Sequence, residues 1–277
     1  MGTLYVVATP IGNLEDLTFR AVNVLRSVGL IAAEDTRTAR KLLGRYGLAT
    51  PVTSYHARNA RGKLQAVLAA LAEHDVALIS EAGTPGLSDP GSELAAEAAR
   101  CGFPVVTVPG PSAVTAALAV AGLPVQRFLF LGFLPAKSGE RRRALQGVAA
   151  LPFALVLLEA PHRVRETLRD MLDCLGDRRV VVCRELTKVH EEVFRGTVGT
   201  ALEHFTVPRG EFTLVVEGAV EGSQRPGENA APDPRALLSR LRTQGASARD
   251  AVAEAARATG VRRKKLYRMW LEGANER

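Results

Sequence analysis

The chain has 277 residues, of which 47% are hydrophobic and 23% charged, a balance typical of globular proteins with packed cores. No apolar run reaches the roughly 18–20 residues that a membrane-spanning helix needs, so no membrane partner is expected. The net charge of +7 gathers at the C-terminal end, since residues 230–277 carry 11 Lys or Arg against 5 Asp or Glu. This asymmetry predicts that the end of the chain meets a polyanion.

The first half of the chain alternates short apolar runs with amphipathic helical patterns. Strands are predicted at residues 4–8, 30–33, 52–54, 76–79 and 105–108, and helices at residues 14–27, 37–46, 60–73, 92–100 and 112–121. Such alternation favours a parallel sheet with helices on both faces. We therefore expect an N-terminal α/β domain over residues 1–122.

The second half has fewer helices between its strands. Strands are predicted at residues 128–131, 153–158, 180–183, 192–196 and 211–216, and helices at residues 140–149, 163–174 and 200–205. The short connection between the third and fourth of these strands indicates a hairpin, and hence a mixed sheet. Residues 123–218 are expected to form a second α/β domain.

Residues 219–233 are polar and rich in Gly and Pro, which is typical of a linker. Helical patterns follow at residues 235–242, 248–258 and 262–272, with breaks at Gly245 and at Thr259-Gly260. Three short helices, the last of them basic, predict a helix-turn-helix-like domain over residues 234–277.

The three cysteines lie far apart in apolar settings, at Cys101, Cys174 and Cys183. Their number and positions favour reduced thiols in a cytoplasmic protein. The spacing of Cys and His matches no zinc site, so no metal is expected. The first residues show neither the basic region nor the cleavage site of a signal peptide.

Loops rich in Gly and Pro follow five of the predicted strands. They read TPIGN (9–13), SEAGTPGLSDPG (80–91), PGPSA (109–113), GFLP (132–135) and EAPHR (159–163). Ligands of open α/β sheets bind at the carboxyl ends of strands, so these loops predict one cleft built largely from backbone. The chain has no G-x-x-x-x-G-K-[ST] phosphate loop, no G-x-G-x-x-G dinucleotide motif and no G-x-S-x-G nucleophile elbow.

Six motifs carry a specific resemblance. LYVVATPIGNLED, AAEDTRTARKLL, SEAGTPGLSDPG, VPGPSAVTAAL, FLGFLP and EAPHRVRETL resemble, in order and spacing, the RsmI family of 16S ribosomal RNA (cytidine-2′-O)-methyltransferases. The likeness covers residues 3–218, and the basic tail is similar to the family's C-terminal helical domain. It implies the tetrapyrrole methylase-like fold, with S-adenosylmethionine bound between two α/β domains, and a homodimer. The implied acceptor is a cytidine in the decoding region of 16S rRNA, free or in the small ribosomal subunit.

The resemblance also implies a set of residues around the methyl donor, although the Ser112 hydroxyl has the alternative role of capping a helix. This set is Pro10, Ile11, Gly83, Thr84, Leu87, Ser112, Ala113 and Glu159, with Arg184 and Glu217 closing the cleft.

Transfer to a weakly acidic 2′-hydroxyl needs good alignment or a general base. The candidate bases are the strand-end residues Glu34, Asp35, Glu81 and His162. Each has an alternative: Asp35 as a helix cap, Glu81 as an ion-pair partner of Arg37, and His162 as part of the cleft wall. Arg37 and Arg163 are candidates for binding RNA phosphates.

The last helical pattern carries a basic cluster for RNA, formed by Arg262, Arg263, Lys264, Lys265, Tyr267 and Arg268. The alternative is a solvated face over a core of Leu266, Met269 and Trp270. Two other functions stay open, a small-molecule methyltransferase acting on a tetrapyrrole-like acid and a non-enzymatic RNA-binding protein. The basic tail argues against the first of these, and the intact cleft loops argue against the second.

Overall fold

The computed structural model of the chain describes residues 1–87, 91–219, 234–244, 246–259 and 261–272. The predicted linker therefore lies outside the described residues except at Ala219, as do residues 88–90 of the SEAGTPGLSDPG loop. None of the described helices is both long and apolar enough to cross a lipid bilayer.

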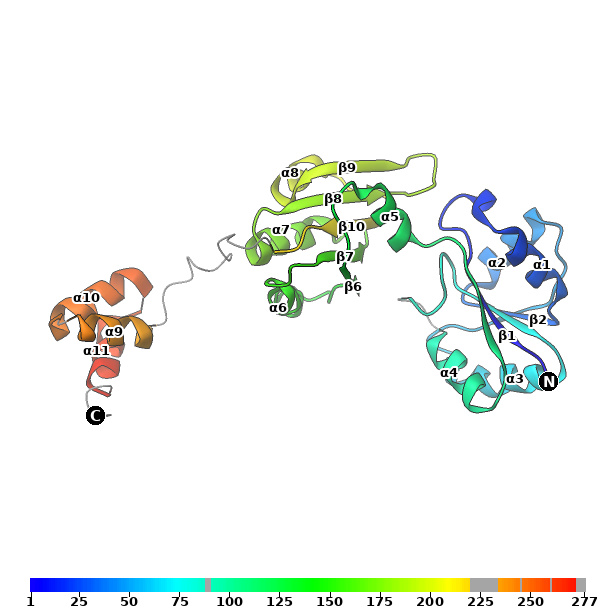
Figure 1. Cartoon of the computed structure of the whole chain (residues 1–277), viewed down its shortest axis with the longest axis horizontal. Coiled ribbons are helices and arrows are strands. Elements are labelled where there is room, and N and C mark those ends of the chain that lie inside the picture. The colour runs from blue at the N-terminus through cyan, green and yellow to red at the C-terminus, as the bar shows by residue number, and fades with distance from the viewer. Residues whose placement is uncertain (88–90, 220–233, 245, 260, 273–277) are drawn as a thin grey trace.

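The first sheet is fully parallel, as the alternating pattern predicts (Figure 1). Its strands, in the spatial order β3-β2-β4-β1-β5, are β1 (Leu4–Val7), β2 (Leu30–Ala33), β3 (Val52–Ser54), β4 (Val76–Ile79) and β5 (Val105–Val108). Helices α1 (Phe19–Ser27) and α2 (Thr36–Arg45) pack on one face, and α3 (Ala60–Glu73) and α4 (Ser92–Arg100) on the other. All four residues of the central strand β4 are buried, because helices cover both of its faces.

One predicted helix, at residues 14–27, is wrong at its start. The structure has a short 3₁₀ turn over Leu14–Asp16, and α1 begins only at Phe19. Leu17 is extended, and the hydroxyl of Thr18 accepts a hydrogen bond from the backbone N–H of Ala21. Thr18 is thus the N-cap that sets where α1 begins.

The second sheet is mixed and contains the predicted hairpin. Its order is β6-β7-β10-β8-β9, with strands β6 (Phe128–Phe133), β7 (Ala154–Glu159), β8 (Arg179–Arg184), β9 (Glu192–Thr197) and β10 (Phe212–Val216). Only β6 and β7 pair in parallel; β10 is antiparallel to β7 and β8, and β9 to β8. Helices α6 (Ser138–Val148), α7 (Val164–Leu175) and α8 (Val198–His204) cover one face.

Helix α5 (Ala113–Ala121) covers the other face of the second sheet (Figure 1). Val114, Ala117 and Ala121 pack in one cluster with residues of β7, β8 and β10. The division at residue 122 places α5 in the first domain by chain order, but by packing this helix belongs with the second sheet. We therefore call residues 1–111 the first lobe and residues 113–218 the second lobe.

Three C-terminal helices form a core of their own. They are α9 (Pro234–Thr243), α10 (Ala248–Thr259) and α11 (Arg263–Glu272), and they bury Leu238, Ala255 and Leu266. Trp270 packs against this core, and the Arg242 guanidinium lies 4.2 Å from the centre of its ring. Trp270 is thus part of the domain's packing rather than of an exposed base-stacking surface.

Candidate functional site

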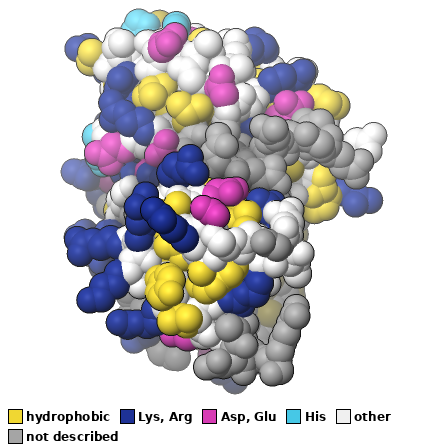
Figure 2. Space-filling model, turned by 90° about the vertical axis from the view of Figure 1, so that its left-hand side faces the viewer, with side chains coloured by type: hydrophobic (Ala, Val, Ile, Leu, Met, Phe, Trp, Pro, Cys, Tyr) yellow, Lys and Arg dark blue, Asp and Glu magenta, His cyan; other side chains and the backbone are white. Residues whose placement is uncertain are grey.

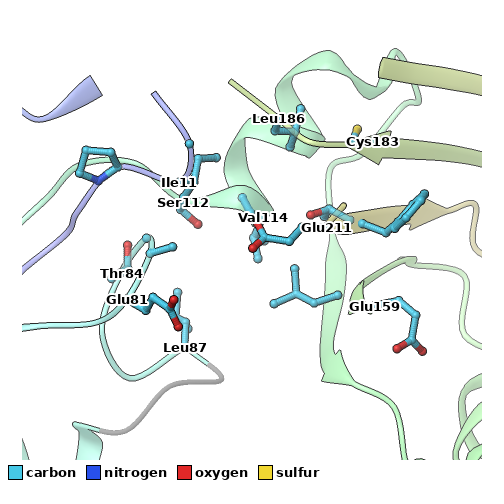
Figure 3. A pocket seen from close by; sticks show the side chains of 18 of the residues that line it. Ile11, Glu81, Thr84, Leu87, Ser112, Val114, Glu159, Cys183, Leu186 and Glu211 are labelled. Atoms are coloured by element: carbon cyan, nitrogen blue, oxygen red, sulfur yellow. The ribbon is translucent and has the colours of Figure 1, made fainter. Parts of the chain in front are cut away.

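A pocket of about 530 Å³ lies between the two lobes. The first lobe contributes the loops after β1, β2 and β4, and Ser112 lies between the lobes. The second lobe contributes the start of α5, two phenylalanines of β6, the ends of β7 and β8 and the start of β10 (Figure 3). Eight residues predicted around the donor line it: Pro10, Ile11, Gly83, Thr84, Leu87, Ser112, Ala113 and Glu159. Loops distant in sequence therefore share one cavity.

Hydrogen bonds tie the first-lobe loops to one another. Thr9 and Gly83 exchange two backbone hydrogen bonds, of 2.8 and 3.0 Å, so the loops after β1 and β4 form one wall. Gly83 has a φ of +80°, a conformation that side chains disfavour. The hydroxyl of Thr84 donates to the carbonyl of Pro111 at 3.3 Å, which joins the loop after β5 to the same wall.

Ser112 stands at the N-cap position of α5, but its side chain makes no capping hydrogen bond. The alternative role of its hydroxyl as a helix cap is therefore not realised here. The side chain lines the pocket beside Ile11 instead (Figure 3). Its hydroxyl is thus one of the few polar groups that a ligand in the pocket can reach.

The second-lobe wall is mostly apolar, with Leu158, Cys183, Leu186 and Phe212 lining the pocket. Burial raises the pKa of the Cys183 thiol to about 11. This thiol therefore stays protonated at neutral pH and acts as a small apolar side chain. Apolar walls with a few hydroxyl and carboxylate groups suit a flat heterocycle with a polar tail.

Glu159 lines the pocket at the end of β7, yet its carboxylate is engaged elsewhere. Oε1 accepts from the N–H of Ala160 at 2.9 Å and lies 3.3 Å from Nε of Arg163. Oε2 accepts from the hydroxyl of Thr167 at 2.6 Å. Figure 3 shows the carboxylate turned away from Glu81 and Thr84.

Two of the four candidate bases, Glu34 and Glu81, lie in the pocket lining. They are adjacent, since the backbone N–H of Glu81 donates to Oε2 of Glu34 at 3.3 Å. The two carboxylates belong to neighbouring parallel strands, β2 and β4, whose carboxyl ends meet at the same edge. Among the described residues no ion pair within 4.0 Å joins Glu81 to Arg37, but the charge of Glu81 is one of the causes that raise the pKa of Arg37, after the closer carboxylate of Asp35.

Asp35 caps α2 and pairs with Arg37 instead of facing the cavity. Its carboxylate accepts from the backbone N–H groups of Arg37 and Thr38 and lies 3.0 Å from the Arg37 guanidinium. The side-chain hydrogen bond from Arg37, followed by the backbone bonds, lowers the pKa of Asp35 to about 2. A carboxylate with so low a pKa is a poor proton acceptor. Arg37 itself is 85% exposed beside the pocket loops.

Besides Asp35 and Arg37, four predicted residues of the two lobes lie outside the pocket lining. His162 is exposed, next to the lining residues Ala160 and Pro161. Arg163 donates to the carbonyls of Leu134 and Pro135, which holds its guanidinium inside the second lobe. The two remaining residues, Arg184 and Glu217, form ion pairs with Glu192 at 3.1 Å and Arg179 at 3.5 Å.

The direction of β10 explains why Glu217 lies away from the pocket and why Glu211, which the sequence pattern did not predict, lines it. Because β10 runs antiparallel to β7 and β8, its start lies beside their carboxyl ends and its own end lies far from them. Glu211, Phe212 and Thr213 therefore line the pocket, whereas Glu217 does not. Other lining residues that were not predicted include Leu14, Thr38, Phe130, Phe133, Cys183 and Leu186.

The predicted basic residues of the tail lie on and beside α11. Arg263, Lys264, Lys265 and Arg268 are exposed, as is Arg262 just before the helix, and Tyr267 is 49% exposed. Figure 2, which views the molecule from the end where the tail helices lie, shows Lys and Arg side chains gathered beside a hydrophobic patch. The exposed basic residues and Tyr267 of α11 have the charge and the aromatic group that suit a nucleic-acid surface.

Comparison with known families matches two models to the chain. Residues 3–202 match the Tetrapyrrole (Corrin/Porphyrin) Methylases, and residues 228–274 match the RsmI C-terminal HTH domain. Two curated relatives named "Ribosomal RNA small subunit methyltransferase I" match nearly the full length. The relative from Synechocystis sp. is 46% identical, over 98% of each chain, and that from Pseudomonas aeruginosa is 45% identical, over 98% of this chain and 97% of the relative.

Solved structures with lower identity share the fold. The methyltransferase CobJ superposes with a TM-score of 0.60 at 20% identity, over 79% of this chain and 95% of its own. A uroporphyrin-III C-methyltransferase from Thermus thermophilus, complexed with S-adenosylhomocysteine, superposes with a TM-score of 0.58 at 20% identity, over 78% and 97% of the two chains. At these identities the likeness shows the fold alone.

Proposed function

The chain belongs to the tetrapyrrole methylase family and, along its whole length, to the ribosomal RNA small subunit methyltransferase I group, and on this premise we propose that it methylates a cytidine 2′-hydroxyl in the decoding region of 16S rRNA. The family resemblance read from the motifs is thereby confirmed. The chain is an enzyme that transfers a methyl group from S-adenosylmethionine to ribosomal RNA.

The observation that supports this proposal most directly is the pairing of two features in one chain. An interlobe pocket fit for a small donor occurs together with a separate basic helical domain. A small acid acceptor would need only the pocket. A macromolecular polyanion explains both features, since the tail can hold RNA while a nucleotide reaches the pocket.

The pocket residues fit the donor by their chemistry. We propose that Ile11, Leu87 and Ala113 flank its adenine ring, and that the hydroxyls of Thr84 and Ser112 bind its polar groups. The positive φ of Gly83 and of Gly86 shapes a loop in which backbone can approach a ligand closely. When bound, the donor supplies a methyl group on a positively charged sulfur, which is reactive toward an oxygen nucleophile.

We assign the proton-accepting role to the Glu34–Glu81 pair. Of the four candidates, only these two carboxylates line the pocket, and they lie on the first-lobe wall beside the donor loops. Asp35 caps α2 and forms an ion pair with Arg37, and His162 lies outside the pocket lining. The exposed guanidinium of Arg37 can hold a phosphate of the acceptor strand at this rim.

We also propose that the chain acts as a cytoplasmic homodimer. Helix α5 carries no charged residue, and Val120 on its outer side is 38% exposed. The edge strand β5 likewise leaves Val105 37% exposed. Singly exposed valines are ordinary on a protein surface, so the proposal rests on the family resemblance. Light scattering during size-exclusion chromatography would give the mass directly.

The test of the proposed function is methyl transfer from radiolabelled S-adenosylmethionine to three acceptors: 30S subunits lacking the modification, naked 16S rRNA and a tetrapyrrole acid. Label in a cytidine 2′-O-methyl group after nuclease digestion supports the proposal. Transfer to the tetrapyrrole alone, or to a base rather than a ribose, contradicts it. Thr84→Arg, which places a long cation in the pocket, should abolish both donor binding and transfer.

A further inference from the structure

The loop between β8 and β9, residues 185–191, joins the second lobe to the first beside the pocket. Leu186 is buried, lines the pocket and packs in one cluster with Ile11 of the first lobe. The next residue, Thr187, accepts a hydrogen bond of 3.0 Å at Oγ1 from the backbone N–H of Asn13. Among the described residues, this is the only hydrogen bond between residues 1–111 and residues 113–218.

The two segments approach so closely that the first lobe needs a glycine. A Cβ atom placed on Gly12 would lie 2.5 Å from Cγ of Lys188 and 2.8 Å from Oγ1 of Thr187. Such distances are well inside van der Waals contact. Gly12 therefore permits the contact that Thr187 makes with Asn13.

The loop reaches this position in a strained conformation. Glu185 has a φ of 52° and Thr187 a φ of 67°, and they are the only non-glycine residues with positive φ in the described chain. For a β-branched residue such as Thr this region is a genuine outlier. Strain of this kind persists only where the surroundings hold it in place, and it is common at ligand-binding sites.

A network of charged side chains holds the strained loop. Lys188 donates to Oε1 of Glu185 at 2.9 Å and to Oε2 of Glu211 at 3.0 Å. Oε1 of Glu185 also accepts from the backbone N–H of Glu211 at 2.9 Å, and the N–H of Thr187 donates to Glu191 at 2.6 Å. Because Glu211 itself lines the pocket, the network connects the loop directly to the pocket wall.

We propose that Thr187 is a positioning residue that sets the width of the donor pocket by fixing Asn13, and with it Ile11, against Leu186. The inference rests on the proposed function for the identity of the ligand. Thr187 touches no reacting atom; it acts through the first-lobe backbone. Without its hydroxyl the lobes separate more readily, so the binding-competent pocket is populated for a smaller fraction of the time.

The test compares Thr187→Val, which keeps the β-branched shape, with Thr187→Ser, which keeps the hydroxyl. Thr107→Val on β5 is the matched control, since Thr107 is an exposed threonine of the first lobe that lies outside the loop of residues 185–191. Two quantities are measured on the full chain: the Kd for S-adenosylmethionine by calorimetry, and hydrogen exchange of the Asn13 amide. Loss of one hydrogen bond should weaken donor binding about three- to tenfold in Thr187→Val.

The Asn13 amide should exchange faster by a similar factor in the Val variant, and the Ser variant should stay near the wild type in both measurements. The donor KM should rise in the Val variant while kcat changes little. Thr187→Gly gives a second variant that lacks the hydroxyl but adopts positive φ without strain, so it remains informative if the Val variant fails to fold.

Wild-type donor affinity and wild-type Asn13 exchange in both the Val and Gly variants would overturn the inference, even if their thermal stability fell. Failure of the wild-type chain to bind the donor would instead contradict the proposed function. An equal loss of donor affinity in Thr107→Val would also overturn it, because the effect would then come from replacing any threonine by valine and not from the hydrogen bond between Thr187 and Asn13.

Discussion

The hydroxyl of Thr167 on α7 donates a 2.6 Å hydrogen bond to Oε2 of Glu159 at the end of β7, and both side chains are buried. The other carboxylate oxygen is occupied by the N–H of Ala160 and lies beside Arg163. The Glu159 carboxylate therefore holds the loop after β7, in addition to the place of Glu159 in the pocket lining.

We expect Glu159→Ala to destabilise the second lobe strongly, because it leaves the partly buried guanidinium of Arg163 without its carboxylate. Breaking such a pair by removing one partner costs about 3 kcal/mol of unfolding free energy. Urea unfolding followed by circular dichroism measures the loss. The control is Glu140→Ala, which breaks only the exposed pair with Lys137 and should cost less than about 1 kcal/mol. Equal stabilities of the two variants would contradict this role.

Glu81→Gln and Glu34→Gln test the proposed base. If one of these carboxylates accepts the proton of the 2′-hydroxyl, its replacement should lower kcat by roughly 10²–10⁴-fold. The Kd for the donor should change little, since the amide keeps the size of the side chain. Single-turnover transfer to the RNA substrate gives the rate. Full activity in both variants would contradict the proposed base, and the reaction would then depend on the alignment of the 2′-hydroxyl with the donor methyl group.

Asp35 gives a prediction about pH. Its pKa of about 2 lies below the ordinary value of 3.8, so the folded state favours its ionised form. The stabilisation is present above the unfolded pKa and is lost as the pH falls through about 2. We expect stability to fall less with pH below about 4 in Asp35→Asn than in the wild type, as thermal melts would show. Its methyl-transfer profile near neutral pH should match the wild type; a shifted profile would restore Asp35 as a candidate base.

Most of the first lobe could be predicted because short, mostly apolar runs alternate there with amphipathic helical patterns. Strands β2, β3, β4 and β5 have the predicted bounds. Spacing alone could not show that α5 packs on the second sheet, because an apolar helix suits either lobe. The helix start at Phe19 was missed because the capping hydroxyl of Thr18 is a local signal within a continuous amphipathic pattern.

The candidate site was predictable where strands are parallel and their ends coincide. Glu34, Glu81 and Gly83 follow parallel strands and indeed line one pocket. The rule fails for an antiparallel strand, whose beginning lies at the pocket edge, as Glu211 shows. Nor can a linear sequence reveal the contact between Asn13 and Thr187, which joins residues 174 positions apart.

The cysteines should differ sharply in reactivity. Cys101 is exposed, whereas Cys183 is 1% exposed and its thiol has a pKa of about 11. We expect a thiol reagent at neutral pH to modify Cys101 quickly in the native chain and Cys183 only after unfolding, as mass spectrometry of peptides would show. Because Cys183 lines the pocket, saturating donor should slow its modification further. Rapid labelling of Cys183 in the native chain would mean that the pocket wall opens.

The exposed face of α11 predicts how RNA binding depends on salt. Lys264 and Arg268 are one helical turn apart and both exposed, so they can contact successive phosphates. The logarithm of the RNA-binding constant falls linearly with the logarithm of the salt concentration, and each phosphate contact contributes about 0.7–0.9 to the steepness of that fall. Replacing both residues with Ala should therefore make the slope shallower by about 1.5. Donor affinity should not change, because the pocket lies in the other two lobes.

Arg249→Ala with Arg257→Ala removes the same charge from exposed positions on α10 and is the matched control. Tyr267→Ala separates stacking from charge: loss of one stacked base should cost about 1–3 kcal/mol of binding free energy and leave the salt slope unchanged. If the α10 and α11 double variants lose equal affinity, net charge alone guides the tail to RNA. If only the α11 variants lose affinity, this helix face contacts the RNA directly, and the tail places the substrate rather than merely attracting it.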